Sequence, residues 1–344
     1  MGEYYDGTKL LSLLDLDGEV PEIYMATTNR TGGKTVYFSR LLVNRFKRKG
    51  EKFAVLYRYK YELDSVADKF FKDVNGLFFP GDIMTSKARA KGVYHDIYLN
   101  DEHCGYALAI NCSEQIKRNS HLLSDTMTMF LDEFQSETGN YCPDEVNKLI
   151  SIHTSIARGH GKHVRRVPLY MCGNPVTMLN PYYTALGVTD RLDDKTRFLR
   201  GHGWVLEQGY VDSAARAQRE SGFNRAFSSS KYVAYSSESA YLNDNSAFVE
   251  KPEGQGRYIA TIKCDGTDYA VREYAKEGIV YCDDRADSTF PLRLSAGTGD
   301  HDVNYVMLRQ NTYLVNNLRW YFERGCFRFK DIKCKSAVMK ALSY

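Results

Sequence analysis

The stretch Thr28-Asn-Arg-Thr-Gly-Gly-Lys-Thr35 combines residue types that could hold a phosphate chain, because it lies between a short apolar run and an amphipathic one. In a strand–loop–helix context, backbone N–H groups and the positive end of the helix dipole converge on an anion, and glycines let the backbone approach it. Lys34 would reach the outer phosphates, and the Thr35 hydroxyl would complete a magnesium shell. The full P-loop pattern begins with glycine, so Thr28 leaves an ordinary helix start as the alternative. The expected nucleotide contacts are Thr28, Asn29, Arg30, Thr31, Gly32, Gly33, Lys34 and Thr35.

A second chemical stretch lies about a hundred residues further on, where the apolar run of residues 126–131 ends in Asp132-Glu133. In P-loop nucleoside triphosphatases such a strand faces the loop, with the Asp holding magnesium and the neighbouring carboxylate orienting the attacking water. An acidic turn after a strand is the alternative for this stretch alone. Together the two stretches predict a magnesium–ATP site with Lys34 and Glu133 as catalytic residues and with Thr35 and Asp132 as metal ligands. Asn174 follows a third apolar run and could sense the outer phosphate, or simply form a turn before proline.

The elements that must position these residues alternate between strand and helix patterns. Residues 34–49 are expected to form a helix ending at Gly50, and residues 52–58 a buried strand, which completes a right-handed βαβ unit. Residues 93–99 and 106–111 read as a hairpin with a longer loop, and 141–158 as a helix before a strand at 167–172. The fold class we expect is an α/β P-loop nucleoside triphosphatase of the additional-strand type.

The second half of the chain predicts a separate α+β domain. Residues 206–245 weaken into Ser/Tyr/Ala-rich sequence, which we interpret as a linker or hinge module between domains at 1–205 and 246–344. Strands are expected at 248–251, 258–264, 269–274 and 279–282, followed by a long helix from Asp302 to Arg324 and a closing helix at 331–342. With 344 residues, each of the two domains is large enough for its own core.

Composition excludes several other classes of protein. Hydrophobic residues make up 43% and charged residues 26%, which is typical of a globular protein, and no run approaches the roughly 18 apolar residues of a membrane span. The N-terminus lacks a signal-peptide pattern, and the eight cysteines form no C-x-x-C pair, so free thiols in a reducing compartment are expected. The net charge of +3 is small, but residues 319–344 are basic and aromatic. They suit contact with a phosphate backbone or, alternatively, form a solvated helix face.

These motifs, together with residues that have no generic role in ATPases, resemble one family along nearly the whole chain. The sequence is similar to the DNA-packaging ATPases of small short-tailed phages with protein-primed genomes, which are relatives of the terminase large subunit. The residues that carry the resemblance, besides the two motifs and Gly173-Asn174-Pro175, are Asn44-Arg45-Phe46, Arg58-Tyr59-Lys60, Glu62-Leu63, Asn140-Tyr141, Pro143, Glu145-Val146, Asn180-Pro181-Tyr182-Tyr183, Phe248, Glu250-Lys251 and Leu318-Arg319.

The resemblance implies ATP-driven translocation of double-stranded viral DNA into a preformed capsid. It implies a homomeric ring, a pentamer, docked on the capsid portal in the host cytoplasm, and leaves open whether a packaging RNA joins. In such a ring ATP lies between neighbouring subunits, and one subunit supplies an arginine finger to the site of the next. The family's finger position falls on Arg158. The alternative is that Arg158 only complements the negative end of the helix dipole. Lys60 matches a second basic residue at the subunit boundary, and Arg30 could touch the γ-phosphate.

The resemblance also implies a C-terminal domain of ribonuclease-H type that has lost nuclease activity. A working two-metal nuclease would need clustered carboxylates. The candidates are Asp265, Asp268, Asp283, Asp284, Asp287 and Asp302, and turn chemistry accounts for all of them. Two alternative functions therefore stay open: a packaging ATPase with an active metal-dependent endonuclease, and a low-turnover nucleotide-binding assembly protein in which Thr28 marks a degenerate site.

Overall fold

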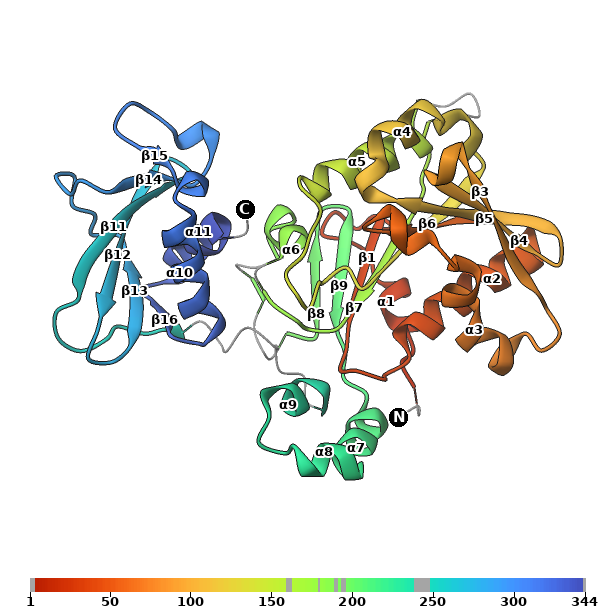
Figure 1. The fold of residues 1–344 in the computed structure, drawn as a ribbon, viewed down its shortest axis with the longest axis horizontal. Helices are drawn as coiled ribbons and strands as arrows, with labels where there is room; N and C mark the ends of the chain where they lie inside the picture. The colour runs from red at the N-terminus through yellow and green to blue at the C-terminus, as the bar shows by residue number, and fades with distance from the viewer. Residues whose placement is uncertain are drawn as a thin grey trace. The chain divides into compact units, whose positions relative to one another are not determined.

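The computed structural model describes residues 4–158, 163–178, 180–188, 191–192, 196–237 and 248–342. The chain divides into two compact units, the first comprising Met1–Pro175 and Lys195–Ser239 and the second Val176–Asp194 and Ala240–Tyr344. No helix in the described ranges is long and apolar enough to cross a membrane. The two units are described separately below (Figure 1).

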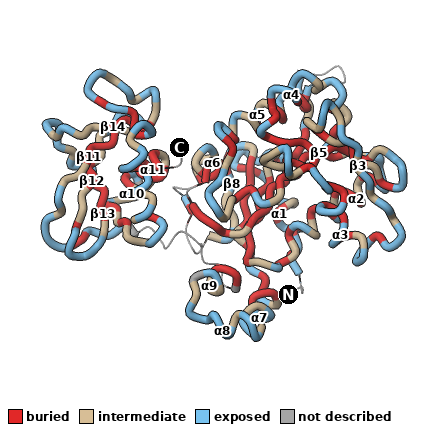
Figure 2. The backbone as a smooth tube through the Cα atoms, in the orientation of Figure 1, coloured by how far each residue is buried: buried red, intermediate tan, exposed pale blue. Residues whose placement is uncertain are grey.

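The first unit is built on a nine-stranded mixed sheet in the order β3-β4-β5-β2-β6-β7-β1-β9-β8. Six neighbouring strands are parallel, namely β5, β2, β6, β7, β1 and β9. The edge strands β3, β4 and β8 pair antiparallel. The central strands are almost continuously buried, as expected of parallel strands covered on both faces (Figure 2). The strands are β1 (Ile23–Thr27), β2 (Lys52–Tyr57), β3 (Met84–Arg89), β4 (Tyr94–Leu99), β5 (Glu102–Ala109), β6 (Thr126–Asp132), β7 (Leu169–Gly173), β8 (Phe198–Gly201) and β9 (Trp204–Gln208).

Helices cover both faces of this sheet. The crossover from β1 to β2 and that from β6 to β7 run in opposite directions across the sheet, so right-handed connections place their helices, α2 and α5, on opposite faces (Figure 1). α2 begins after Gly33 and ends at Gly50, whose φ of 67° is the left-handed conformation common at helix ends. The helices of this unit are α1 (Thr8–Ser12), α2 (Lys34–Lys49), α3 (Val66–Phe78), α4 (Ser113–Arg118), α5 (Glu145–Ile156), α7 (Asp212–Glu220), α8 (Gly222–Ala226) and α9 (Lys231–Ser237).

The second unit contains a seven-stranded mixed sheet in the order β10-β16-β13-β12-β11-β14-β15. Strands β11, β12 and β13 form an antiparallel meander, and the sheet is extended in parallel by β14 and β15 on one side and by β16 and β10 on the other. The elements are α6 (Pro181–Ala185), β10 (Phe248–Val249), β11 (Arg257–Cys264), β12 (Thr267–Tyr274), β13 (Ile279–Asp283), β14 (Arg293–Ser295), β15 (Val306–Met307), α10 (Thr312–Glu323), β16 (Phe327–Phe329) and α11 (Ile332–Leu342).

Several sequence predictions differ from this architecture. The predicted helix from Asp302 to Arg324 is wrong over its first ten residues: β15 and a 3-10 turn occupy part of them, and α10 begins only after Asn311, whose side chain accepts a hydrogen bond from the N–H of Leu314. The hairpin between β4 and β5 is confirmed, but its loop is short, because Asn100 and Asp101 both adopt positive φ and make a two-residue turn.

The segment predicted as a linker, 206–245, is in large part regular structure of the first unit. Its first residues complete β9 in the sheet, and residues 212–237 form the three short helices α7, α8 and α9. Residues 238–247 lie outside the described ranges. The Ser- and Tyr-rich composition was a poor guide because these helices are short, and Ala214 and Ala215 are the only residues that α7 and α8 bury fully.

Candidate ATP site

The loop from Thr28 to Gly33 connects β1 to α2 at the carboxyl edge of the sheet, where parallel sheets bind ligands. Gly33 caps α2 with φ 90°, a conformation that favours glycine. At Gly32 a Cβ would lie 2.8 Å from the Thr28 hydroxyl oxygen, so only glycine fits there without displacement. The predicted order of strand, glycine-bearing turn and helix is therefore present, and the backbone N–H groups at the start of α2 are arranged as a phosphate-binding loop requires.

Lys34 is a buried cation whose described hydrogen bonds all go to neutral groups. Its ammonium donates to the Thr28 hydroxyl at 3.0 Å, to the Thr28 carbonyl at 3.3 Å and to Asn174 Oδ1 at 3.0 Å. Only 6% of the residue is exposed, and this burial lowers the pKa of Lys34, although Cys172, Asp132 and Glu133 act to raise it. Because a desolvated ammonium is stabilised by an anion, a phosphate group fits this position.

Thr28, in place of the first glycine of the P-loop pattern, fits the loop without backbone strain. It is not among the residues with positive φ, and its side chain is 1% exposed. Its methyl group faces residue 209, which is glycine; a Cβ there would lie 2.9 Å from Thr28 Cγ2. Gly209 thus provides the space that the threonine occupies, and the Thr28 hydroxyl becomes a partner of Lys34.

Asp132, at the end of β6, and Thr35, in the first turn of α2, form a pair of hard oxygen ligands. Thr35 Oγ1 lies 3.2 Å from Asp132 Oδ1, and the Cys172 thiol donates to the same Asp132 oxygen at 2.9 Å. Complete burial raises the pKa of the Cys172 thiol, and the adjacent Asp132 raises it further, so this group stays a donor. The structure thus brings the two predicted metal ligands together. Hydroxyl and carboxylate oxygens are ligands that suit magnesium.

Glu133 directly follows Asp132 in an unusual backbone conformation, with φ 52°. Its backbone N–H donates to Asp132 Oδ1 at 2.9 Å, which fixes the Asp132 carboxylate relative to the Glu133 backbone. Desolvation raises the pKa of Glu133, with further increases from Asp132 and Glu137, while Arg30 and Arg58 act in the opposite direction. A more basic carboxylate at this position is a better acceptor for the proton of an attacking water.

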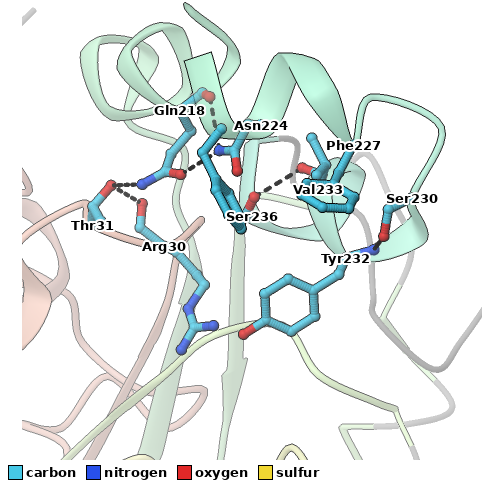
Figure 3. A pocket seen from close by; sticks show the side chains of 10 residues that line it. Arg30, Thr31, Gln218, Asn224, Phe227, Ser230, Tyr232, Val233 and Ser236 are labelled. Carbon is cyan, nitrogen blue, oxygen red and sulfur yellow. Dashed lines mark hydrogen bonds between the residues drawn. The ribbon is translucent and has the colours of Figure 1, made fainter. Parts of the chain in front are cut away.

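The guanidinium of Arg30 lies beside the ring of Tyr232, which belongs to α9 (Figure 3). It forms an ion pair with Glu137 at 3.2 Å and lies over the rings of Tyr232 and Tyr235. Both tyrosine hydroxyls donate to Glu137, at 3.3 and 3.0 Å. A hollow of about 380 Å³ opens beside Arg30; its lining residues are Arg30, Thr31, Gln218, Phe223, Asn224, Phe227, Ser230, Tyr232, Val233 and Ser236. The loop is therefore covered on this side by α7, α8 and α9.

Asn29, a further predicted contact, ties the loop to the same helices. Its side chain accepts from the N–H of Val211 at 2.9 Å and donates to the Val211 carbonyl at 3.2 Å. The residue is fully buried. Asn29 therefore positions the loop through its side chain, and only its backbone remains to face a ligand.

Two predicted residues, Arg158 and Lys60, lie away from the loop between β1 and α2. Arg158 is exposed just beyond the end of α5, and its described hydrogen bond, at 3.4 Å, goes to Ser155 of the same helix. Lys60 is exposed in a 3-10 turn after β2, and its ammonium donates to the Lys91 carbonyl at 2.7 Å. β2 is three strands away from β1, roughly 14 Å at the usual strand spacing. Neither side chain has a described contact with the loop of its own chain.

Sequence reasoning missed four residues of the site: Arg58, Glu137, Cys172 and Tyr235. Arg58 contributes to the family resemblance, but the sequence indicates no role for it. Cys172 could have been found from its position, because it lies one residue before the end of β7, paired with Asp132 of the neighbouring strand. Glu137 and Tyr235 come from a loop and from a segment interpreted as a linker, and no local pattern connects them.

No three of the six acidic residues considered for a nuclease form a group that could hold a metal ion in the described structure. Five of them are paired with separate partners in the described structure: Asp265 with Lys340, Asp268 with Tyr305, Asp283 with Arg272, Asp284 with Lys330 and Asp302 with Lys263. Asp287 accepts from the N–H and hydroxyl of Thr289. Of the six, only Asp265 belongs to a described group that could hold a metal ion, together with Cys264 and Asp300.

The fold and the site have the arrangement of P-loop nucleoside triphosphatases, in which a parallel sheet carries the glycine-bearing loop after β1 and a carboxylate-ended strand that faces it. The sequence model of the family described as Podovirus DNA encapsidation protein (Gp16) matches residues 3–343, and the chain belongs to this family. It is therefore a viral DNA-packaging protein, and the family resemblance inferred from the sequence is confirmed.

Known proteins resemble the chain over nearly its full length. The DNA packaging protein of Bacillus phage phi29 is 25% identical over 303 residues, which is 87% of this chain and 86% of that protein. The DNA packaging protein of Bacillus phage B103 is 22% identical over 317 residues, 91% and 92% of the two chains. Among solved structures, the phi29 viral genome packaging motor assembly has a TM-score of 0.58 at 24% identity and 96% coverage of both chains. The Phi-28 gp11 DNA packaging motor has a TM-score of 0.60 at 15% identity, with 99% and 98% coverage. Both structures share the fold.

Proposed function

We propose that this protein is the ATP-hydrolysing subunit of a homomeric ring, a pentamer, that drives double-stranded viral DNA through the portal of a preformed capsid in the host cytoplasm. Lys34 and the loop around it hold the phosphates of ATP, and Glu133 orients the attacking water. Thr35 and Asp132 would hold a magnesium ion, which would supply positive charge to neutralise the outer phosphates during hydrolysis. Asn174, whose side-chain oxygen already contacts Lys34, lies where it can follow the state of the outer phosphate.

The observation that carries the ring proposal is the position of Arg158 in the first unit. Because α5 runs antiparallel to the strands, its C-terminal end lies at the amino edge of the sheet. Arg165, in the same region, donates to the carbonyls of Ser124 and Ile156, and Ser124 lies two residues before the start of β6. Asp132 is at the opposite end of β6, and a strand of seven residues spans about 20 Å. Arg158 is therefore too far away to act as a finger in its own site, and we assign it to the site of a neighbouring subunit.

A mixing experiment tests this assignment. Arg158→Ala should lower ATP turnover by roughly 10³-fold or more while ATP binding is retained. Lys34→Ala should lose phosphate contact and turnover. In a head-to-tail ring, an equal random mixture of the two variants assembles a complete site at about one quarter of the boundaries, so phosphate release should return to about one quarter of the wild-type rate.

The control for this experiment is Arg48→Ala, which removes another exposed arginine, in the last turn of α2. We expect it to keep wild-type turnover. An equal mixture that stays inactive although both variants assemble would show that Arg158 does not act in trans. Unchanged turnover in both Lys34→Ala and Glu133→Gln would overturn the site itself. DNA- and capsid-stimulated phosphate release should accompany activity; its absence would favour a low-turnover assembly protein.

We further propose that the second unit is of ribonuclease-H type without nuclease activity. An antiparallel meander extended by two parallel strands supports the first part, and the ion pairs that separate the candidate carboxylates support the second. Two-metal cleavage needs carboxylates that converge on ions about 4 Å apart. Incubation with plasmid DNA and Mn²⁺ should leave the plasmid intact; linear or nicked product would support the endonuclease alternative.

A further inference from the structure

The guanidinium of Arg58 holds the backbone on the C-terminal side of Glu133. It lies at the end of β2, where Nη1 donates to the Glu133 carbonyl at 2.8 Å and Nη2 donates to the Phe134 carbonyl at 2.6 Å. One planar side chain thus fixes two successive carbonyls that follow the proposed catalytic carboxylate. Since the N–H of Glu133 is held by Asp132, hydrogen bonds hold the residue on both sides.

Glu145 holds Arg58 in turn. Arg58 Nε donates to Glu145 Oε1 at 3.1 Å, and the other carboxylate oxygen accepts from the N–H of Cys142 at 2.9 Å. The side chain of Glu145 is fully buried and that of Arg58 is 11% exposed. The ring of Tyr141 stacks on the guanidinium, 4.9 Å from its central carbon. The three hydrogen-bonding nitrogens of Arg58 are therefore all committed, in a geometry that lysine cannot reproduce.

The held segment has an unfavourable local conformation. Glu133 has φ 52°, and a non-glycine residue keeps such a conformation only where its surroundings over-determine it. Arg58 donates to the carbonyl of Glu133 itself and to that of Phe134, the next residue. Without these hydrogen bonds the segment can relax to a negative φ, which would change the direction of the Glu133 side chain.

We propose that Arg58 and Glu145 are positioning residues for ATP hydrolysis, which act by holding the backbone of Glu133 in its strained conformation. This inference rests on the proposed role of Glu133. Neither Arg58 nor Glu145 has a described contact with Thr28–Thr35, so the pair affects the chemical step and leaves nucleotide binding unchanged.

The test separates this role from simple stabilisation of the fold. Glu145→Gln keeps an acceptor for the Cys142 N–H and keeps Arg58 in place, whereas the double variant Arg58→Met/Glu145→Gln removes the guanidinium without leaving a buried unpaired charge. Three quantities are measured on the full chain: kcat and KM from phosphate release, the Kd of ATP, and the thermal midpoint of unfolding. We expect kcat to fall less than tenfold in Glu145→Gln and roughly 10²-fold in the double variant, with the Kd of ATP unchanged within threefold, since small misplacements of a catalytic group have effects of this size.

A matched control is the neutral pair Arg89→Met/Asp96→Asn. It removes another part-buried arginine–carboxylate pair of the same unit, at the sheet edge formed by β3 and β4. This control should lose thermal stability and keep kcat. If the double variant at positions 58 and 145 does not fold, Arg58→Lys keeps a cation opposite Glu145 and should still lower kcat about tenfold or more at unchanged Kd.

The outcomes are distinguishable. A folded double variant, or Arg58→Lys, with wild-type kcat overturns the positioning role, and so does a loss of kcat that only parallels weaker ATP binding. Glu133→Gln is measured beside them: wild-type turnover there removes the catalytic role of Glu133 and this inference with it. An inactive Glu133→Gln with an active double variant refutes the positioning role alone.

Discussion

Gly209→Ala provides a direct test of how the loop accommodates Thr28. The added Cβ would lie 2.9 Å from Thr28 Cγ2, and its next contacts are ordinary ones, 3.6 Å from the Thr27 carbonyl and 3.7 Å from a Glu207 oxygen. Neither partner can move easily, because Gly209 N–H is bonded to the Thr27 carbonyl at 2.7 Å and the Thr28 hydroxyl is held by Lys34 and the Asn29 carbonyl, both at 3.0 Å. Overpacking of this kind costs about 1–3 kcal/mol of unfolding free energy.

The cause of that cost is tested with Thr28→Ser, which removes the methyl group and keeps the hydroxyl. The serine variant alone should lose about 1 kcal/mol for one buried methyl. In its background Gly209→Ala should cost below about 0.5 kcal/mol, so the double-mutant cycle should give a coupling of about 1–2 kcal/mol.

Urea unfolding of the first unit gives the measurement. The chain has two tryptophans, Trp204 in β9 and Trp320 in α10. Replacing Trp320 by phenylalanine makes the buried Trp204 the only indole reporter. Additive effects of Gly209→Ala and Thr28→Ser would refute the explanation that glycine at 209 makes room for threonine at 28.

Three further predictions concern the same unit. Burial acts to lower the pKa of His153, but hydrogen bonds to Glu22 and to the Val167 carbonyl raise it overall. The hydrogen bond from His153 in turn lowers the pKa of Glu22. The pair therefore contributes most to the free energy of unfolding between about pH 4.3 and pH 6.5, the pKa values of Glu and His in the unfolded chain. In urea titrations, His153→Gln should lower the free energy of unfolding by less than about 1 kcal/mol at pH 6, and by a smaller amount at pH 8.5. Tyr235→Phe removes the hydrogen bond to Glu137 and should lower the unfolding free energy by about 1 kcal/mol; no loss would show that the bond contributes nothing. Thr35→Ala should raise the magnesium concentration for half-maximal phosphate release, whereas Thr35→Ser should not, and equal values would remove Thr35 from the metal site.

The central part of the site could be predicted because each half of it is a local pattern. The loop from Thr28 to Thr35 is contiguous, and Asp132-Glu133 ends a single apolar strand. Parallel strands bring their carboxyl ends to one edge, so the meeting of Thr35 with Asp132 follows from topology alone. The central strands β1, β2, β6 and β7 were recognisable because each is an almost continuously buried apolar run, whereas β3, β8 and β9 were not predicted.

The parts that could not be predicted depend on contacts between distant segments. Arg58 and Glu145 are 87 positions apart and meet only because β2 and β6 are neighbours in the sheet. The helices α7 to α9 are short and bury few residues fully, so they lack a strong periodic signal. The missed strands β14 and β15 have three and two residues, too few for alternation to be visible.

The location of α5 connects the two proposals about this motor. The helix begins at Glu145, which holds the guanidinium that fixes the backbone of Glu133, and it ends just before Arg158. Its 12 residues span about 18 Å, and its hydrogen-bonded backbone transmits displacement with little bending. If Arg158 acts in the neighbouring site, then one rigid element joins a subunit's own water-orienting residue to the finger that it offers to the next subunit. A movement of the Glu133 segment would then displace Arg158 in the neighbouring site. In a mixed ring, the Arg58→Met/Glu145→Gln variant should therefore lower turnover at two sites: its own site and the site that receives its Arg158.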